Sequence, residues 1–585
     1  MTAPGPRVPS NIGATLRRLF GYLLIRRVVV LGAILLLLAG LLLQSVQPLL
    51  FGNAVDDVFN GNTDDLGSQA TFILVLALAT FALRWAAANL IAIAAQTAMR
   101  KLRQELFEKL QTLSLGFHES RSSGDLMSRV TSDTEVINTF LSSSLFGLVS
   151  AMIQMVAITV IMFSLDVVLA VIVLLIAPLS LLVMSRIGKQ VAHNFTILQG
   201  AVGSINGYLE ERVTGQKTLQ AYGQQGATLE ELRERSIVAR DADQKASFLG
   251  WMVMPTVRLV GNADIAAVAL IGGIMASNGR VGVGTVVAFL GFSQQFSMPV
   301  GAISRSINSA IQSAAGANRV FELLDEQPAI TDGVDARPFP RAEGDVVFDE
   351  VDFSYDTGGQ ILFDNSFRAE PGQMIGMVGP TGAGKSTIIN LIGRFYEIDD
   401  GEIRIDGEPI IDLRLDDLRL RAAVVLQTPF LFSETVMYNL KYGRGDATDE
   451  ECIEAAKDAN ARWFIERLPD GYDTVLSESG SNLSQGQRQL LTIARAIVAQ
   501  PDVLILDEAT SSVDTRTERA IQVAMQRLMD GRTSFVIAHR LSTIRHADKI
   551  IALDGGVIQE IGTHEELLAN RGFYHDLFMQ QFART

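Results

Sequence analysis

The chain has 585 residues, 48% of them apolar and 19% charged, and a formal net charge of −15. This acidic balance lacks the basic footprint that nucleic-acid backbones require, so no nucleic acid is expected as a partner. The single cysteine, Cys452, excludes an intrachain disulfide, and the six histidines are scattered without metal-ligand spacing. Long apolar runs fill the first half to about residue 310, whereas the remainder has the composition of a soluble α/β protein.

The first apolar run follows a mixed apolar and basic segment, residues 14–27. This segment fits an amphipathic helix on the cytoplasmic membrane surface and, equally, an ordinary basic flank, so both interpretations stay open. Residues 28–55 carry no charge and exceed the about 20 residues that a helix needs to cross a bilayer. A second helical pattern runs from Ala70 to Leu113. At about 1.5 Å per residue it spans roughly 65 Å, so it should project beyond a hydrocarbon core of about 30 Å.

Further spans are predicted near residues 136–165, 167–185, 248–275 and 281–303. Only Asp166 separates the first two, which indicates a membrane hairpin with a short outer loop. Arg and Lys gather at the N-terminus and in two long polar segments, residues 100–134 and 186–246. By the positive-inside rule, both termini and both polar segments are therefore expected in the cytoplasm. The spans are expected in the inner membrane of the cell.

The second half contains a phosphate-binding pattern, G-x-x-x-x-G-K-S, between an apolar run that predicts a strand and one that predicts a helix. Its glycines let the backbone N–H groups turn toward phosphates at a helix N-terminus. Lys385 would contact the terminal phosphates and the Ser386 hydroxyl would bind Mg²⁺. The pattern predicts ATP and Mg²⁺ bound by Gly379, Thr381, Gly382, Gly384, Lys385, Ser386 and Thr387.

A second apolar strand, residues 503–506, carries Asp507 and Glu508 at its tip. In this arrangement Asp507 organises Mg²⁺ and Glu508 polarises the attacking water. The two carboxyl groups follow the phosphate-binding pattern within one domain-sized stretch, which indicates an ATP hydrolase.

The segment Leu483-Ser484-Gln485-Gly486-Gln487 resembles the signature motif of ATP-binding-cassette (ABC) proteins, with Gln485 in place of the first glycine. Together with the six spans, the motifs make residues 14–580 resemble a half-transporter of the bacterial type IV ABC exporters. The resemblance implies an adenine-stacking Tyr355, a catalytic and metal-binding Gln427, a catalytic switch residue His539, and a nucleotide-interface residue Asp514. It also implies that Ser484, Gly486 and Gln487 serve the nucleotide of a second cassette.

The resemblance predicts a multi-domain membrane protein: an all-α six-helix transmembrane domain with long cytoplasmic extensions, followed by an α/β P-loop ATPase domain. The expected parts are an elbow segment at 1–27, a transmembrane domain at 28–320, a linker at 321–344 and a nucleotide-binding domain at 345–585. The six helices are expected at about 28–55, 70–115, 136–165, 167–200, 240–275 and 281–315.

Two cytoplasmic segments resemble the coupling helices that dock on the cassettes, namely Gly124–Arg129 and Gly215–Tyr222. The segment before the signature motif departs from the family, because Ser479 stands where an arginine is usual. With Gln485, this departure resembles the catalytically complete subunit of heterodimeric multidrug exporters. We therefore expect a second half-transporter as partner and favour a heterodimer over a homodimer.

Polar and charged residues within membrane spans are costly and so are candidates for contact with a substrate. These candidates, each of which could instead pair with a neighbouring helix, are Arg84, Arg258, Asn262, Asp264, Gln294, Gln295 and Asn308. The expected function is ATP-driven export of a lipid-like, drug-like or peptide substrate by alternating access, in contact with membrane lipids. The alternatives are an importer on an exporter fold, of the siderophore type, and an ATP-gated channel or regulator.

Overall fold

The computed structural model describes residues 12–355, 358–507, 515–537 and 545–581. Its contacts divide the chain into two units. The first contains residues up to Gln111 together with Ser123–Glu326, and the second contains Thr112–Ser122 together with the chain from Gln327 onward. The second unit is therefore a cassette that includes a short piece of the membrane half.

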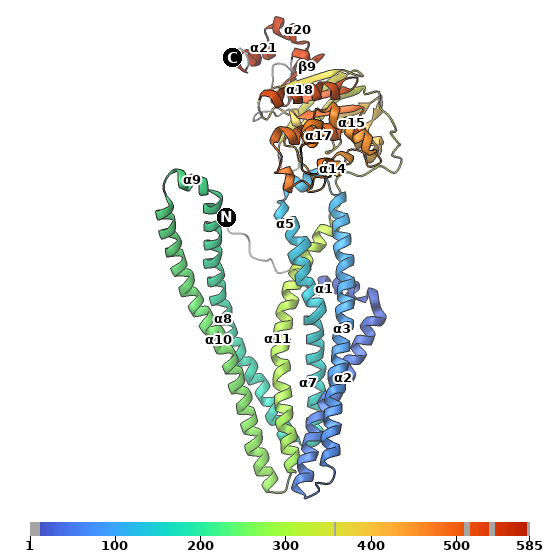
Figure 1. The fold of residues 1–585 in the computed structure, drawn as a ribbon. Coiled ribbons are helices and arrows are strands. Elements are labelled where there is room, and N and C mark those ends of the chain that lie inside the picture. The colour runs from blue at the N-terminus through green and yellow to red at the C-terminus, as the bar shows by residue number, and fades with distance from the viewer. Residues whose placement is uncertain (1–11, 356–357, 508–514, 538–544, 582–585) are drawn as a thin grey trace. The chain divides into compact units, whose positions relative to one another are not determined.

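The first unit consists of long helices (Figure 1). Its major helices are α1 (Ile12–Leu23), α2 (Arg27–Phe59), α3 (Leu66–Thr112), α7 (Leu145–Leu165), α8 (Val167–Thr214), α10 (Gln225–Ser277) and α11 (Val283–Asp325). Short helical pieces α5 (Ser123–Ser128), η2 (Arg129–Asp133), α6 (Thr134–Thr139) and η3 (Phe140–Ser144) lead into α7. The described helices include five that are long and apolar enough to cross a membrane, at Ile12–Phe59, Leu66–Thr112, Ser123–Leu165, Gln225–Ser277 and Val283–Asp325. The remaining predicted span falls on α8, which is charge-free from Val167 to Ser185.

Residues 14–27, for which two interpretations stood open, begin as the separate helix α1. Thr15, Leu19 and Leu23 recur one turn apart and are buried, so one stripe of α1 packs against the protein. Arg18 on the same helix forms an ion pair with Asp325 at the end of α11, with an N–O distance of 2.6 Å. This contact joins the first and last helices of the unit.

Helices α2 and α11 cross at two glycines. A Cβ atom on Gly52 would lie 2.4 Å from the carbonyl oxygen of Gly284, a distance that no side chain tolerates. The Asp56 carboxylate accepts a hydrogen bond from the Gly284 N–H at 2.6 Å. Small residues let helix backbones approach closely in a membrane, and this crossing uses that property.

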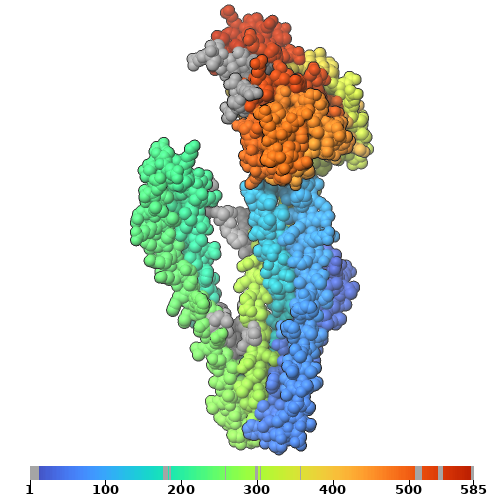
Figure 2. All heavy atoms as spheres, in the orientation of Figure 1, coloured from blue at the N-terminus to red at the C-terminus, as the bar shows by residue number. Residues whose placement is uncertain are grey.

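Helices α8 and α10 run side by side and are joined by α9 (Gln216–Ala221), as Figures 1 and 2 show. Their α9 end stands apart from α11 and α7 within the same unit. The segment Gly215–Tyr222, predicted as a coupling helix, therefore forms the tip of a hairpin.

The cassette contains two sheets. The four-stranded antiparallel sheet has the order β2-β1-β4-β5, with β1 (Val346–Ser354), β2 (Gln360–Ala369), β4 (Asp400–Ile405) and β5 (Glu408–Pro409). The six-stranded sheet has the order β10-β9-β3-β8-β7-β6, with β3 (Met374–Val378), β6 (Ala422–Val425), β7 (Val503–Asp507), β8 (Thr533–Ile537), β9 (Lys549–Asp554) and β10 (Val557–Gly562). All its pairings are parallel except that of β10 with β9.

Nine helices of the described cassette lie around these sheets. They are α12 (Lys385–Ile392), α13 (Leu415–Arg421), α14 (Val436–Lys441), α15 (Asp449–Asp458), α16 (Arg462–Ile465), α17 (Gln485–Ala499), α18 (Thr515–Met529), α20 (His564–Asn570) and α21 (Phe573–Gln581). The strand β8 is buried along its whole length, as parallel strands covered on both faces usually are.

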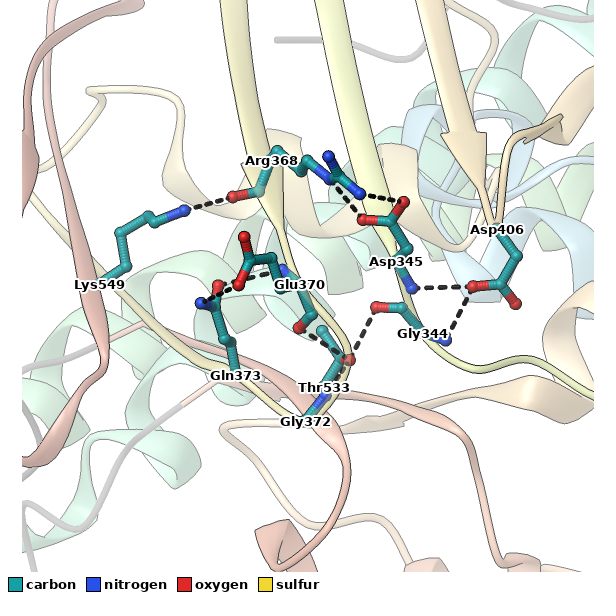
Figure 3. Close-up of polar contacts among 9 residues, drawn as sticks. All are labelled: Gly344, Asp345, Arg368, Glu370, Gly372, Gln373, Asp406, Thr533 and Lys549. Carbon is teal, nitrogen blue, oxygen red and sulfur yellow. Dashed lines mark hydrogen bonds and ion pairs between the residues drawn. The ribbon is translucent and has the colours of Figure 1, made fainter.

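A polar network fastens the two sheets at the amino end of β8 (Figure 3). The Thr533 hydroxyl accepts a hydrogen bond from Gly372 N–H at 3.0 Å and donates one to the Gly344 carbonyl at 2.7 Å. The Asp406 carboxylate accepts from the N–H groups of Gly344 and Asp345. This network lies at the amino ends of the strands. Because β3, β8 and β7 are parallel, their carboxyl ends share the opposite edge of the sheet, where the phosphate-binding loop lies.

Candidate active site

The phosphate-binding loop connects β3 to α12 at the carboxyl edge of the parallel sheet, where ligands of open α/β sheets bind. Gly379 and Gly384 have φ angles of +155° and +99°. A Cβ on Gly379 would lie 2.2 Å from the Leu553 carbonyl oxygen, and one on Gly384 would lie 2.7 Å from a Leu362 methyl carbon. The loop can therefore turn only with glycine at these two positions.

The Lys385 side chain lies inside the loop. Its ammonium group donates hydrogen bonds to the carbonyl oxygens of Gly379 and Pro380, both at 2.8 Å. Burial lowers the pKa of Lys385, and the negative charge of Asp507 acts in the opposite direction. Since β3, β8 and β7 are parallel neighbours, the cation of the loop and the carboxylate at the tip of β7 lie on the same edge of the sheet, although they are far apart in the sequence.

The other loop residues lie around this cation. Ser386 is exposed in the first turn of α12, and Thr387 is buried. The Thr387 hydroxyl lies 3.2 Å from the Tyr355 hydroxyl, within hydrogen-bond distance. Thr381 and Gly382 are exposed at the loop surface.

The parallel pairing of β6, β7 and β8 aligns the ends of these strands at one edge of the sheet. Asp507 is aligned with Ile537, the last residue of β8, and Val425 at the end of β6 is aligned with Leu506. Gln427 is exposed two residues beyond β6, on the same edge as Asp507. The predicted residues Glu508, Asp514 and His539 lie outside the described residues.

A magnesium ion would find oxygen ligands here. Magnesium prefers carboxylate, hydroxyl and water oxygens, and the exposed Ser386 hydroxyl and the Asp507 carboxylate are groups of this kind. The chemistry of these donors fits the ion predicted from the sequence.

The signature motif forms the start of α17. Ser484 is its exposed N-cap, and its side chain accepts a hydrogen bond from the Gln487 N–H at 3.3 Å. The Gln487 side chain accepts one from the Ser484 N–H at 2.9 Å, completing a capping box. Gly486 is buried within the first turn. The motif therefore presents a hydroxyl and a helix N-terminus to solvent, which suits an anion supplied from outside this chain.

Ser479, the departure from the family pattern, adopts a left-handed conformation with φ of +53° and is exposed. Its neighbour Gly480 also has a positive φ, and a Cβ there would lie 2.9 Å from a Leu431 methyl carbon. Ser479 thus occupies a tight turn immediately before the signature motif.

The segment Thr112–Ser122, which contains α4 (Leu115–Ser120), belongs to the cassette unit. The predicted first coupling helix, Gly124–Arg129, belongs instead to the membrane unit, where Arg129 donates a hydrogen bond to the Arg319 carbonyl at 3.1 Å. The first coupling helix was therefore predicted a few residues too far toward the C-terminus. The prediction followed a sequence pattern, whereas the contact with the cassette is made by α4.

Of the polar candidates in the membrane unit, some form hydrogen bonds within it and others are exposed. Arg84 donates a hydrogen bond to the Gln44 side chain at 2.7 Å, and Gln295 donates one to the Gln44 carbonyl at 3.4 Å. Gln44 was missed in the sequence, although it is a polar residue within the charge-free run 28–55 and the same rule would have found it. Asp264 is 1% exposed and accepts a hydrogen bond from Ser293. The remaining candidates, Asn262, Gln294 and Asn308, are exposed in this unit.

Arg258 lines a hollow of about 610 Å³ on α8 and α10, together with Phe195, Ser247, Gly250, Trp251 and Pro255. Pro255 has no N–H group, so it cannot donate the usual helical hydrogen bond to the Trp251 carbonyl one turn earlier. The hollow combines two aromatic rings and one guanidinium group.

Comparison with known proteins assigns both halves of the chain. Residues 30–300 match the ABC transporter transmembrane region, and residues 362–511 match the ABC transporter ATPase family. An ABC transporter ATP-binding protein of Bacillus subtilis, YfiC, whose function is uncharacterised, is 39% identical over 97% of this chain and 94% of its own length. A fatty acid ABC transporter ATP-binding/permease protein of Mycobacterium bovis is 41% identical over 86% of this chain and 80% of its own length.

The solved structure of a bacterial Atm1-family ABC exporter with ATP bound superimposes with a TM-score of 0.78 at 30% identity. The match covers 96% of this chain and 98% of that one.

Proposed function

The chain belongs to the ABC transporter family as an exporter half-transporter, with membrane and ATPase domains in one polypeptide, and we propose that it exports anionic amphiphiles from the cytoplasmic side of the inner membrane. The observation that supports the ATPase part is the buried Lys385 ammonium inside the phosphate-binding loop, on the same carboxyl edge of the parallel sheet as Asp507. That pair supplies one charge for the terminal phosphates and one for the metal ion.

The residues of the site have distinct roles in this proposal. Lys385 and the loop N–H groups bind the phosphates, and the Tyr355 ring stacks on adenine. Ser386, Gln427 and Asp507 would hold Mg²⁺, and the bound ion would supply positive charge against the phosphates. Glu508 orients and polarises the attacking water, and His539 contacts the terminal phosphate.

ABC exporters work as dimers, and the geometry of α17 supports the same arrangement here. Ser484 and Gly486 lie at an exposed helix N-terminus, so they would complete the phosphate site of a partner cassette across the interface. Asp514 would lie at the interface between the two cassettes. Release of the bridging phosphate after hydrolysis would let the cassettes part. We propose a heterodimer, because Ser479 and Gln485 depart from the pattern of the usual homodimer.

The substrate assignment rests on the hollow around Arg258. This residue lies roughly 28 Å along α10 from Ser277, at about 1.5 Å per residue, near the inner boundary of a hydrocarbon core about 30 Å thick. A guanidinium group there would bind a carboxylate or phosphate headgroup, while Phe195 and Trp251 would contact an apolar chain. A relative that is a fatty acid transporter supports the same class of substrate.

The orientation follows from the basic polar segments, with both termini and the cassette in the cytoplasm. Import on an exporter fold and ATP-gated regulation are the alternatives. Regulation alone would need little hydrolysis, so the intact Glu508 favours transport.

Replacing Arg258 tests the substrate assignment. R258Q should weaken ATP-dependent transport of a long-chain fatty acid by about tenfold, the size expected when a charge-assisted hydrogen bond is lost. R280Q, a control in the turn that follows α10, should transport normally. Equal transport by R258Q and the parent protein would remove this hollow from the substrate path.

A further inference from the structure

Tyr396 lies between the predicted adenine-binding residue and the short helix α4. Its ring packs edge-to-face on Tyr355, with ring centroids 5.0 Å apart and an interplanar angle of 88°. Its hydroxyl donates a hydrogen bond to the Glu119 carboxylate in α4. A Cβ atom on Gly116, also in α4, would lie 3.0 Å from the Tyr396 ring. One side chain therefore contacts the nucleotide end of the cassette and α4 together.

A third aromatic ring makes this arrangement stiff. Phe353 is 1% exposed and belongs to the main core of the cassette. Its ring centroid lies 4.8 Å from that of Tyr355 and 5.7 Å from that of Tyr396, and both pairs are in edge-to-face contact. Each aromatic pair favours a particular angle, so a displacement of Tyr355 changes the position that suits Tyr396.

Helix α4 is held at two points. Gly116 lets the ring approach the backbone, and Glu119, which is exposed, fixes the hydroxyl through a charge-assisted hydrogen bond. Because α4 is joined directly to α3 through Leu113 and Ser114, a shift of α4 acts on the end of a membrane-spanning helix.

We propose that Tyr396 is a positioning residue that couples nucleotide occupancy at Tyr355 to the placement of α4 through its hydrogen bond to Glu119. This inference rests on the proposed contact of Tyr355 with adenine. It goes beyond that contact, because it assigns Tyr396 and Glu119 a role in conformational coupling and none in binding ATP. The coupling acts by favouring one position of α4 when the ring of Tyr355 is fixed.

The test follows the membrane domain in the assembled dimer. Nitroxide labels on K101C and K217C, both exposed on this chain, report the distance between α3 and the tip of the α8–α10 hairpin. Cys452 is buried and does not compete for the label. A non-hydrolysable ATP analogue should shift the distance distribution of the labelled parent, and a fluorescent ATP analogue confirms that the site is saturated.

Y396F keeps the ring and removes only the hydroxyl, and E119A removes the acceptor. At saturating nucleotide, each should lower the ratio of shifted to unshifted molecules by about tenfold, near the low end for a hydrogen bond to a charged group. E119Q retains an acceptor oxygen and should lie closer to the parent than E119A does. Y438F, which removes the hydroxyl of an exposed tyrosine elsewhere in the cassette, is the matched control and should shift normally.

A normal shift in Y396F and E119A would overturn the proposal, as would a loss in Y438F of the same size. An E119Q variant as defective as E119A would also contradict it. Y355A tests the premise separately, because loss of the adenine contact should raise the nucleotide concentration needed for saturation. If Y355A saturates normally, the adenine contact is wrong, whatever the result with Tyr396.

Discussion

In the membrane unit, the Ser293 hydroxyl donates a hydrogen bond to one oxygen of Asp264, and the other carboxyl oxygen is buried without a hydrogen-bond partner among the described residues. The apolar segments of α8 and α11 beside it, residues 167–185 and 283–304, carry no charge. A charged carboxylate would be very costly in such surroundings. Asp264 is therefore best accommodated as a neutral acid in this conformation.

Asparagine should consequently replace Asp264 at little cost. D264N retains an oxygen that can accept from Ser293, so its thermal midpoint in detergent should equal that of the parent. S293A leaves the carboxyl group without its donor and should cost about 1–3 kcal/mol. S277A, at the exposed end of α10, is the control for serine removal. A midpoint in D264N as low as that in S293A would show that Asp264 is held as a charged group.

The crossing of α2 and α11 should be sensitive to a single methyl group. G52A places a Cβ atom where the Gly284 carbonyl lies, so the helices must separate, and the expected destabilisation is about 1–3 kcal/mol. G32A in the same helix is the matched control, because its Cβ would only touch Leu90 at 3.8 Å. Thermal unfolding of the two variants distinguishes them, and equal midpoints would contradict the close approach.

Loss of the Lys385 ammonium should weaken nucleotide binding directly. K385A removes the only charged side chain that hydrogen-bonds to the phosphate loop among the described residues, so the dissociation constant of a fluorescent ATP analogue should rise by at least about tenfold. K441A is the control, since this exposed lysine pairs with Asp449 on the surface. Unchanged affinity in K385A would remove the assigned role.

The C-terminal helices should be sensitive to mild acid through His564. Burial lowers the pKa of His564 from its usual value, and the positive charge of Arg545 lowers it further. The imidazole Nδ1 lies 2.6 Å from the Tyr574 hydroxyl. Because the folded state favours the neutral ring, this contribution to stability is present above about pH 6.5. It is lost as the pH falls through the lower pKa of the folded state.

H564N cannot gain this proton, so its midpoint should fall less between pH 7.5 and 5.5 than that of the parent. Identical pH dependence in the two proteins would exclude His564 as the source. Thermal unfolding at both pH values provides the measurement.

Local patterns in the sequence predict a phosphate-binding loop between a strand and a helix, and the structure has this segment between β3 and α12. The spacing from Gly379 to Ser386 dictates the loop chemistry, and an apolar strand ending in Asp507 dictates where the carboxylate lies. Parallel strand pairing then places Asp507 on the same edge of the sheet as Lys385, which is a consequence of the fold class. Both residues were therefore predictable from patterns confined to a few neighbouring residues.

Contacts between distant segments were not predictable in this way. Tyr396 and Glu119 are 277 residues apart, and neither belongs to a motif. The first coupling helix was placed at Gly124–Arg129 from resemblance, whereas the cassette unit includes Thr112–Ser122. Pairing of Asp264 with Ser293 likewise depends on how α10 packs on α11, which periodicity alone does not determine.

Transport in inside-out vesicles tests the central claim most directly. Vesicles that contain this chain and its partner should accumulate a radiolabelled long-chain fatty acid when ATP and Mg²⁺ are added outside. Vesicles that contain the E508Q variant should bind ATP but should not accumulate the fatty acid. ATP-dependent loss of preloaded fatty acid from the same vesicles would show import, and accumulation by E508Q equal to that of the parent would contradict transport driven by hydrolysis at this site.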